Sequence, residues 1–262
     1  MTGDAPPAAT IARFAAMVAA ARRALFITGA GISADSGMPT YRGMGGLYEA
    51  QLTDEGVAIE DALSGEMLAR APALCWKYIH VIEAASRRAE PNAAHEVIAW
   101  LQSRLDVWVL TQNVDGLHRR AGSRQLIEIH GDVHGLSCTA CAFRQRVDDY
   151  AALAPVPHCP HCGAIVRPDV VLFGEALPGE SVAQLRQELA RGFDLVVSIG
   201  TTSVFPYIAA PVLQARARGN ATVEVNPGQS AVSAAVELRI VARAAATMAA
   251  LRQSLSGPAA AG

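Results

Sequence analysis

Four of the five cysteines form two closely spaced pairs, Cys138-x-x-Cys141 and Cys159-x-x-Cys162. The seventeen residues between the pairs give a spacing typical of structural zinc sites, in which thiolates complete a tetrahedron and leave no open position for catalysis. A nearby histidine could replace one thiolate, and two disulfides are the other alternative. Because no export signal is evident, we predict one structural zinc ion rather than disulfides.

A glycine-rich loop follows the apolar run ALFIT and could bind a dinucleotide. Gly29-x-Gly31-x-x-Ala34 matches the fingerprint G-x-G-x-x-G/A. In that fingerprint the first glycine permits a tight turn, and the second lets the backbone approach a pyrophosphate. The helix that follows would offer its free N–H groups to the anion. A glycine turn that only joins a strand to a helix is the alternative interpretation.

The residues after this loop differ from those of an ordinary dehydrogenase. Gly37 and Pro39 both disfavour continuation of the helix, so we expect it to be short. No second strand ending in an acidic residue follows about 20 residues later, as the fingerprint would require. We expect the irregular segment around 39–43 to fold over the nucleotide as a lid that excludes water.

Polar side chains follow two further apolar runs. Gln112, Asn113 and Asp115 come after VWVL, and His130 comes after LIEI. Open α/β sheets bind ligands at the carboxyl ends of their strands, so we expect these side chains to share one sheet edge with the glycine loop. Asn113 and Asp115 could instead only cap the next helix. Since imidazole has an ordinary pKa of about 6.5, we predict that His130 is a general base.

The strands that must position these residues are short apolar runs without alternation, which is typical of strands buried on both faces. We expect them at 24–30, 107–113, 126–131, 170–174, 195–200 and 222–227. Helical patterns lie between them, at 9–23, 93–104, 179–191, 206–218 and 243–254. This alternation predicts an α/β fold with a Rossmann-like, doubly wound parallel sheet.

Two segments interrupt the alternation. Residues 43–90 contain polar loop sequence and about two helices, whereas residues 136–165 contain both cysteine pairs and almost no regular period. We interpret them as an inserted helical module and an inserted zinc-binding module on one side of the sheet. The predicted Rossmann-like domain is therefore discontinuous, and the complete division is 9–42, 91–135 and 166–256 for that domain, with flexible tails at 1–8 and 257–262.

The stretch GAGISADSGMPTYRG (29–43) closely resembles the nucleotide-binding signature of bacterial-type sirtuins, a family of NAD-dependent protein-lysine deacylases. Other motifs of that family occur in the same order and cover most of the chain: TQNVDGLHRRAG (111–122), EIHGDVHGLSC (128–138), RPDVVLFGE (167–175), SIGTTSVFPYIAAP (198–211) and VEVNP (223–227). The resemblance implies an enzyme that uses NAD as co-substrate and produces nicotinamide, O-acyl-ADP-ribose and free lysine. It assigns the zinc ion no chemical role.

The resemblance also implies roles for individual residues. His130 and Asn113 are expected to be catalytic, Asp115 to contact the nicotinamide carboxamide, and Gln112 and Asn113 to contact the adjacent ribose. The other implied NAD contacts are Gly29, Ala30, Gly31, Ile32, Ser33, Pro39, Tyr41, Arg42, Gly200, Thr201, Ser203 and Asn226, the last four on the adenosine side.

The implied chemistry begins with cleavage of the bond between nicotinamide and ribose through an oxocarbenium-like state. The acyl-lysine carbonyl oxygen then attacks the ribose carbon, and His130 helps a ribose hydroxyl attack the resulting alkylimidate. Water would intercept the ribose cation, so the site must exclude it.

The resemblance places the peptide substrate along the run VVLFGE. Val171, Phe173, Gly174 and Glu175 match positions that hold an acyl-lysine peptide, and Phe173 would line the lysine tunnel. An exposed strand edge there could accept an extended peptide by strand addition. A core strand with a polar exit is the alternative interpretation.

The acyl preference follows from two positions in the helical module. Sirtuins that remove succinyl or malonyl groups carry a Tyr-x-x-Arg pair there, and the corresponding residues are Ile79 and Ile82. Two isoleucines offer a carboxylate neither charge nor a hydrogen bond, so we predict a preference for neutral acyl groups. Arg87 or Arg88 could still reach the pocket and accommodate acidic groups.

Net charge and hydropathy exclude some classes of binding partner. The net charge of −2 gives no broad basic surface for nucleic acid, and no apolar run approaches the ~20 residues that span a bilayer. We expect acyl-lysine proteins or peptides as partners, no membrane, a cytoplasmic location and, although the sequence leaves the oligomeric state open, a monomer. Two alternatives stay open: a protein ADP-ribosyltransferase or NAD hydrolase, and a regulator that senses NAD and binds through its zinc module.

Overall fold

A parallel sheet of six strands carries most of the segments that the sequence singles out. The computed structural model describes residues 6–38 and 52–257. In this part of the chain the strand order is β3-β2-β1-β7-β8-β9, and all neighbouring strands are parallel. The strands are β1 (Arg23–Thr28), β2 (Asp106–Thr111), β3 (Leu126–Glu128), β7 (Leu195–Ile199), β8 (Ala221–Val225) and β9 (Leu238–Ile240). Because the order reverses between β1 and β7, a crevice opens there at the carboxyl ends of the strands.

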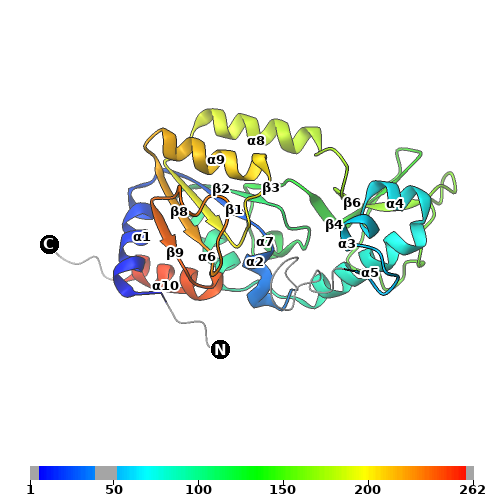
Figure 1. The fold of residues 1–262 in the computed structure, drawn as a ribbon, viewed down its shortest axis with the longest axis horizontal. Coiled ribbons are helices and arrows are strands. Elements are labelled where there is room, and N and C mark those ends of the chain that lie inside the picture. The colour runs from blue at the N-terminus through cyan, green and yellow to red at the C-terminus, as the bar shows by residue number, and fades with distance from the viewer. Residues whose placement is uncertain (1–5, 39–51, 258–262) are drawn as a thin grey trace.

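Helices cover both faces of this sheet, which confirms the predicted doubly wound architecture (Figure 1). One face packs against α1 (Ala8–Ala20), α6 (Ala93–Leu101) and α10 (Ala244–Ser256), and the other against α8 (Gly179–Arg191) and α9 (Pro206–Ala217). Strands β1, β2 and β7 are therefore buried on both sides, which explains their continuous apolar sequence.

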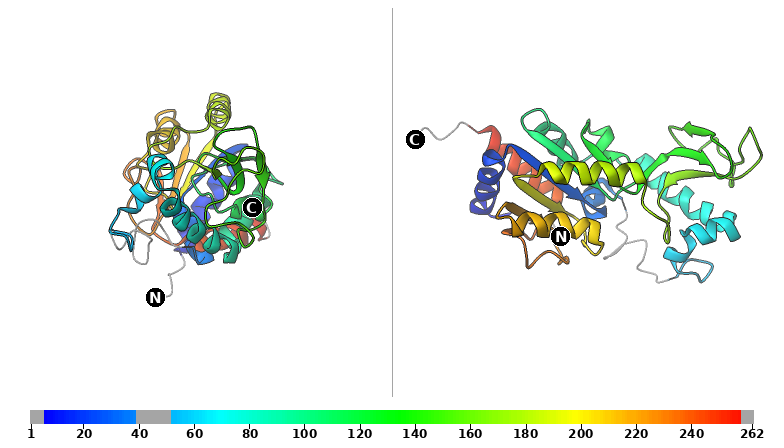
Figure 2. Two further views of the ribbon diagram at one scale, coloured as in Figure 1. Left: turned by 90° about the vertical axis from the view of Figure 1, so that its right-hand side faces the viewer. Right: turned by 90° about the horizontal axis from the view of Figure 1, so that it is seen from above.

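The two inserted segments form a second body beyond one end of the main sheet (Figure 2). It contains α3 (Ile59–Ala62), α4 (Gly65–Arg70) and α5 (Pro72–Arg88), together with an antiparallel sheet of β4 (Gly131–Cys138), β5 (Arg144–Arg146) and β6 (Val166–Val170). Their apolar side chains share one core, and the indole N–H of Trp76 in α5 donates to the Val166 carbonyl in β6 at 3.1 Å. The small sheet thus extends beyond the 136–165 segment on both sides, and the domain limits remain a prediction.

The predicted strand at 170–174 is wrong. Strand β6 ends at Val170, and the backbone of Phe173 then pairs with the helical segment, donating to Leu63 at 2.9 Å and accepting from Gly65 at 3.1 Å. An apolar loop that is held between two modules has the same composition as a buried strand, so hydrophobicity alone cannot separate them.

The predicted strand at 126–131 is also too long. Strand β3 ends at Glu128, and His130 lies in the turn before β4. Gly131 has a φ of 86°, and a Cβ atom there would lie 1.8 Å from the Asp169 carbonyl oxygen. Strands β4, β5 and β9 are not predicted, because very short or irregular strands carry too little periodicity.

Among the residues that the structure describes, no helix has the length and apolar character needed to cross a bilayer.

Candidate active site

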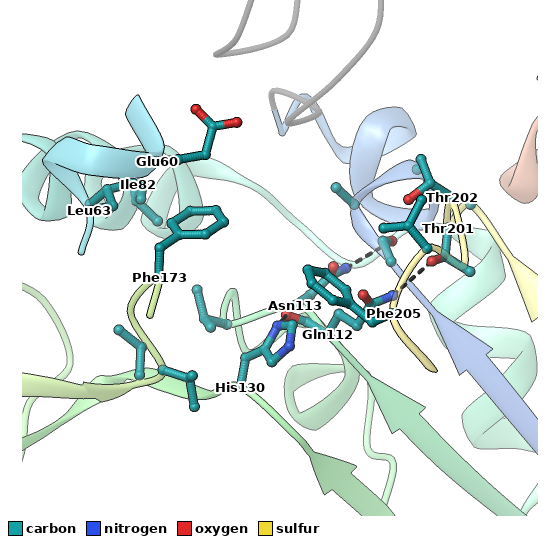
Figure 3. A pocket seen from close by; sticks show the side chains of 18 of the residues that line it. Glu60, Leu63, Ile82, Gln112, Asn113, His130, Phe173, Thr201, Thr202 and Phe205 are labelled. Atoms are coloured by element: carbon teal, nitrogen blue, oxygen red, sulfur yellow. Dashed lines mark hydrogen bonds between the residues drawn. The ribbon is translucent and has the colours of Figure 1, made fainter. Parts of the chain in front are cut away.

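A cavity of about 990 Å³ opens at the carboxyl ends of β1, β2, β7 and β8, where the sheet meets the two inserted segments. Figure 3 shows His130 between a polar end with Thr201 and an apolar end with Ile82 and Phe173. Most of the predicted site residues line this cavity: Gly29, Ala30, Gly31, Ile79, Ile82, Gln112, Asn113, His130, Val171, Phe173, Gly174, Glu175, Gly200, Thr201 and Asn226.

The glycine loop is short and packs against the loop after β7. Helix α2 (Ala30–Ser33) and the 3-10 turn η1 (Ala34–Ser36) end at Gly37, whose left-handed φ of 81° confirms the predicted early end of the helix. The Gly31 N–H donates to the Gly200 carbonyl at 2.8 Å, and a Cβ on Gly31 would lie 2.6 Å from the Gly200 Cα. The second glycine is therefore required by contact with Gly200, a reason that the sequence does not reveal.

Gln112 and Asn113 hold these loops together at the cavity wall (Figure 3). The Gln112 side-chain N–H donates to the Thr201 hydroxyl at 2.8 Å. The Asn113 amide donates to the Gly29 carbonyl and to the Ser33 hydroxyl, both at 3.1 Å. Both side chains are therefore oriented by the fold itself.

Other predicted residues lie behind the cavity wall. Ile32, Ser33, Asp115 and Ser203 are buried and are not among the lining residues. The Asp115 carboxylate accepts from the Ser33 hydroxyl at 2.7 Å and from the Leu117 N–H at 3.0 Å. It thus contacts the first residue of α7 (Leu117–Arg120), whose N-cap residue is Gly116. Burial raises the pKa of Asp115, although both hydrogen bonds oppose the shift.

Three predicted NAD contacts, Pro39, Tyr41 and Arg42, lie outside the described residues, as does the 39–43 segment that we expect to form a lid.

Two buried histidines lie behind Ser33 and Asn113, and the sequence does not mark them as a pair. The rings of His95 and His118 are 4.8 Å apart. His118 Nε2 is 3.0 Å from the Thr28 hydroxyl, and His95 Nδ1 accepts from the Asn92 N–H at 3.3 Å within a capping box that starts α6. Burial lowers the pKa of both, that of His95 to about 4.

We expect this pair to make stability depend on pH. The unfolded chain takes up protons on these histidines below about pH 6.5, whereas the folded chain does not, so stability is lost as the pH falls from 6.5 to 4. For His95 a folded-state pKa of about 4 corresponds to about 3 kcal/mol. Urea unfolding measures the free energy of unfolding at pH 7.5 and at pH 4.5. Between these two pH values, His95→Gln should lose less of this free energy than the unsubstituted chain. An equal loss in both proteins would contradict the prediction.

His130 has a fixed tautomer. Its Nδ1 is 2.9 Å from the backbone carbonyl oxygen of Gln112, which can only accept, so Nδ1 carries the proton. Its Nε2 is then unprotonated in the neutral ring and accepts from the Tyr207 hydroxyl at 2.7 Å. Burial lowers the pKa of His130, although the bond to Gln112 opposes the shift. The imidazole is therefore neutral and able to take up a proton at neutral pH.

Tyr207 is the neighbour of this base that the sequence reasoning misses. It lies within the motif 198–211, immediately after Pro206, which begins α9. A polar aromatic residue at a helix start after a strand-end loop is the only signal that could have marked it.

The segment after β6 forms the side of the cavity near the inserted modules. Glu175, a predicted substrate contact, forms a two-bond ion pair with Arg167 at 2.5 and 2.7 Å and accepts from the Leu172 N–H. Burial alone would raise the pKa of Glu175, but these partners lower it. Because the Phe173 backbone also pairs with the helical module, less of this edge is open to a peptide than the sequence implies.

The apolar end of the cavity is lined by Leu63, Ile79, Ile82 and Phe173, and the Glu60 side chain lies beside them (Figure 3). Arg87 and Arg88 are not among its lining residues, and Arg87 instead approaches Glu83 and Asp149. This end of the cavity therefore provides apolar surface and one carboxylate.

The four paired cysteines come together, as predicted. Their sulfur atoms all lie within 4.8 Å of one another, with Cys138 to Cys162 at 3.5 Å and Cys141 to Cys159 at 3.6 Å. A tetrahedron with Zn–S bonds of about 2.3 Å has sulfur separations of about 3.8 Å, so the cluster fits one zinc ion. The Ala140 N–H donates to the Cys138 sulfur and lowers its pKa, which favours the thiolate.

A family profile, a protein of known sequence and two solved structures all resemble this chain over most of its length. A profile described as "Sir2 family" matches residues 29–206. An "NAD-dependent protein deacylase 2" from Pseudomonas aeruginosa is 50% identical over 242 residues, which are 91% of this chain and 93% of that protein. A Sir2 homolog–NAD complex has a TM-score of 0.83 at 32% identity, covering 92% of this chain and 93% of that one. A Sir2 complex with a p53 peptide and NAD+ has a TM-score of 0.78 at 28% identity, covering 92% and 95%.

Proposed function

The chain belongs to the Sir2 family, and we propose that it is an NAD-dependent protein-lysine deacylase. The observation that carries the proposal is a single cavity in which the neutral base His130 lies between the glycine loop and an apolar pocket. The products are nicotinamide, O-acyl-ADP-ribose and the free lysine.

NAD fits the polar half of the cavity as co-substrate. The loops after β1, β7 and β8 line that half with small and polar residues, among them Gly29, Gly200 and Asn226. In this proposal Gln112 and Asn113 contact the ribose beside nicotinamide. Asp115 contacts the carboxamide only after a small movement of the wall that it supports, since it lies behind that wall.

In the proposed reaction the protein positions the substrates, excludes water from the site and supplies a general base. Nicotinamide leaves as a neutral molecule, so its departure needs no general acid, and the apolar lining keeps water from the oxocarbenium-like ribose carbon. The acyl oxygen attacks that carbon, and His130 then accepts the proton of the ribose hydroxyl that attacks the acyl carbon.

The acyl-lysine enters from the side of Val171, Phe173 and Gly174, while Glu175 holds the turn through its ion pair with Arg167. Its acyl group lies against Ile79 and Ile82. Arg243, the one arginine or lysine among the described lining residues, pairs with Asp35 at 2.5 Å. A carboxylate on the acyl group would thus be buried without a partner.

The test follows nicotinamide and O-acyl-ADP-ribose together, with NAD and either an acetyl-lysine or a succinyl-lysine peptide. We expect peptide-dependent release of both products, and about tenfold or more faster turnover of the acetyl peptide, because burial of an unpaired carboxylate costs well over 1.4 kcal/mol. The matched variant Ile82→Arg should gain succinyl turnover.

Other outcomes would reassign the protein. Nicotinamide release without peptide indicates an NAD hydrolase, and ADP-ribose attached to the peptide indicates a transferase. NAD binding without turnover would favour a regulator. Faster succinyl turnover by the unsubstituted chain would contradict the assignment of the isoleucines.

The zinc cluster lies in the module away from the cavity lining, so we assign it a structural role. Its thiolates must stay reduced to hold the ion, which supports the cytoplasm as the proposed compartment. A monomer remains our proposal for the oligomeric state.

A further inference from the structure

The base of the proposed reaction is covered by a second titratable side chain. The Tyr207 hydroxyl lies 2.7 Å from His130 Nε2, and both residues line the cavity. Since the Gln112 carbonyl fixes the proton on Nδ1, the only lone pair of the ring points at Tyr207. Burial raises the pKa of Tyr207 to about 12, so its hydroxyl stays protonated and donates.

The tyrosine is held in this position by aromatic packing. The Phe205 and Tyr207 rings are stacked at 5.4 Å with an angle of 13° between their planes. Both rings meet the imidazole edge-on, at 86° and 83°. The loop that leads into α9 carries the cavity-lining residues Gly200 and Thr201, so Tyr207 approaches the base from the nucleotide side of the cavity.

The charged residues that flank His130 in the chain form ion pairs with other residues. Glu128 and Asp132 flank it in sequence, and their carboxylates pair with Arg119 and Arg146. Across the cavity Glu175 pairs with Arg167. Among the described titratable groups, Tyr207 is therefore the one in hydrogen-bond contact with the imidazole.

A hydroxyl proton can reach Nε2 in two ways: the ribose displaces Tyr207, or the proton passes through it. We propose that Tyr207 is a further catalytic residue that relays the proton from the ribose hydroxyl to His130. This proposal rests on the proposed deacylase function. As the ribose oxygen bonds to the acyl carbon, its O–H bond breaks and a new O–H bond forms on the tyrosine oxygen. The original tyrosine proton moves to Nε2, giving an imidazolium and a neutral tyrosine.

The test is Tyr207→Phe, which keeps the ring and its stacking but removes the hydroxyl. The relay is used only after nicotinamide has left, so the two steps are measured separately. We expect deacylation in a single turnover to slow by about tenfold or more. Exchange of labelled nicotinamide into NAD, with acetyl-lysine peptide present, should stay within about twofold. The matched control is Tyr78→Phe, since the Tyr78 hydroxyl donates to Glu55 outside the cavity lining and should not matter.

A second measurement is independent of the size of the loss. Two protons move together in the relay. A plot of the deacylation rate of the unsubstituted enzyme against the deuterium fraction of the solvent should therefore be curved. Transfer of one proton in Tyr207→Phe should give a straight line.

Several results would overturn the relay. Unchanged or faster deacylation by Tyr207→Phe would show that the ribose displaces the tyrosine. An equal loss of exchange and deacylation would make Tyr207 a binding or structural residue, and a straight line for the unsubstituted enzyme would exclude a second proton. If the unsubstituted chain lacks both peptide-dependent activities, the proposed function itself fails, which this experiment separates from failure of the relay.

Discussion

His130→Ala is expected to lower deacylation by about 10²- to 10⁴-fold, the usual contribution of a positioned general base. Removal of the imidazole leaves the Gln112 carbonyl and the Tyr207 hydroxyl without their common partner, and no other described titratable group is in hydrogen-bond contact with that position. The base acts after nicotinamide departs, so exchange of labelled nicotinamide should persist. Single-turnover formation of O-acetyl-ADP-ribose beside nicotinamide exchange measures both steps.

This variant needs evidence that its fold is intact. His130 is half-buried in a turn, and its backbone carbonyl accepts from the Val171 N–H at 2.8 Å. Alanine at this position keeps that backbone hydrogen bond. An unchanged melting temperature and an unchanged affinity for NAD are the controls. Full-rate deacylation by His130→Ala would refute the assignment of the base.

Removal of zinc is expected to unfold the small sheet and abolish activity. Binding of structural zinc contributes on the order of 10 kcal/mol in small zinc modules. Loss of even a third of this should lower the melting temperature by about 6–12 °C. Strand β4 begins directly after His130, and β6 leads into the substrate segment, so disorder of this sheet would release both walls of the cavity.

The experiment compares Cys159→Ser with Cys75→Ala. Both cysteines are buried in the core shared by the inserted segments, but only Cys159 belongs to the sulfur cluster. Zinc content by mass spectrometry and melting by circular dichroism should fall for Cys159→Ser, whereas Cys75→Ala should retain its zinc. Retention of zinc, stability and activity by Cys159→Ser would rule out the structural role.

Much of the site was predictable because its residues follow apolar strands. The carboxyl ends of parallel strands must meet at one sheet edge, so Gly29, Gln112, Gly200 and Asn226 could be placed together without coordinates. The cysteine cluster was predictable for a similar reason, since two Cys-x-x-Cys turns at this spacing have few ways to satisfy four thiolates other than a metal.

The errors lie where one segment contacts another that is distant in sequence. The run 170–174 looks like a buried strand because it is apolar, yet its backbone pairs with Leu63 and Gly65 about 110 residues earlier. The ion pair of Glu175 with Arg167 is a contact of the same kind that the sequence does not reveal, while the role of Glu175 toward the substrate stays a prediction.

The sequence by itself determined the parallel sheet, the zinc ligands and the residues at the strand ends, because strand period, glycine geometry and thiolate spacing act over a few neighbouring residues. Only the tertiary structure decided what each site residue contacts: Gly31 against Gly200, Asp115 behind the wall, and Tyr207 on the lone pair of His130. These contacts join loops from different strands, and their geometry is set by the packing of the whole sheet, which no local pattern encodes.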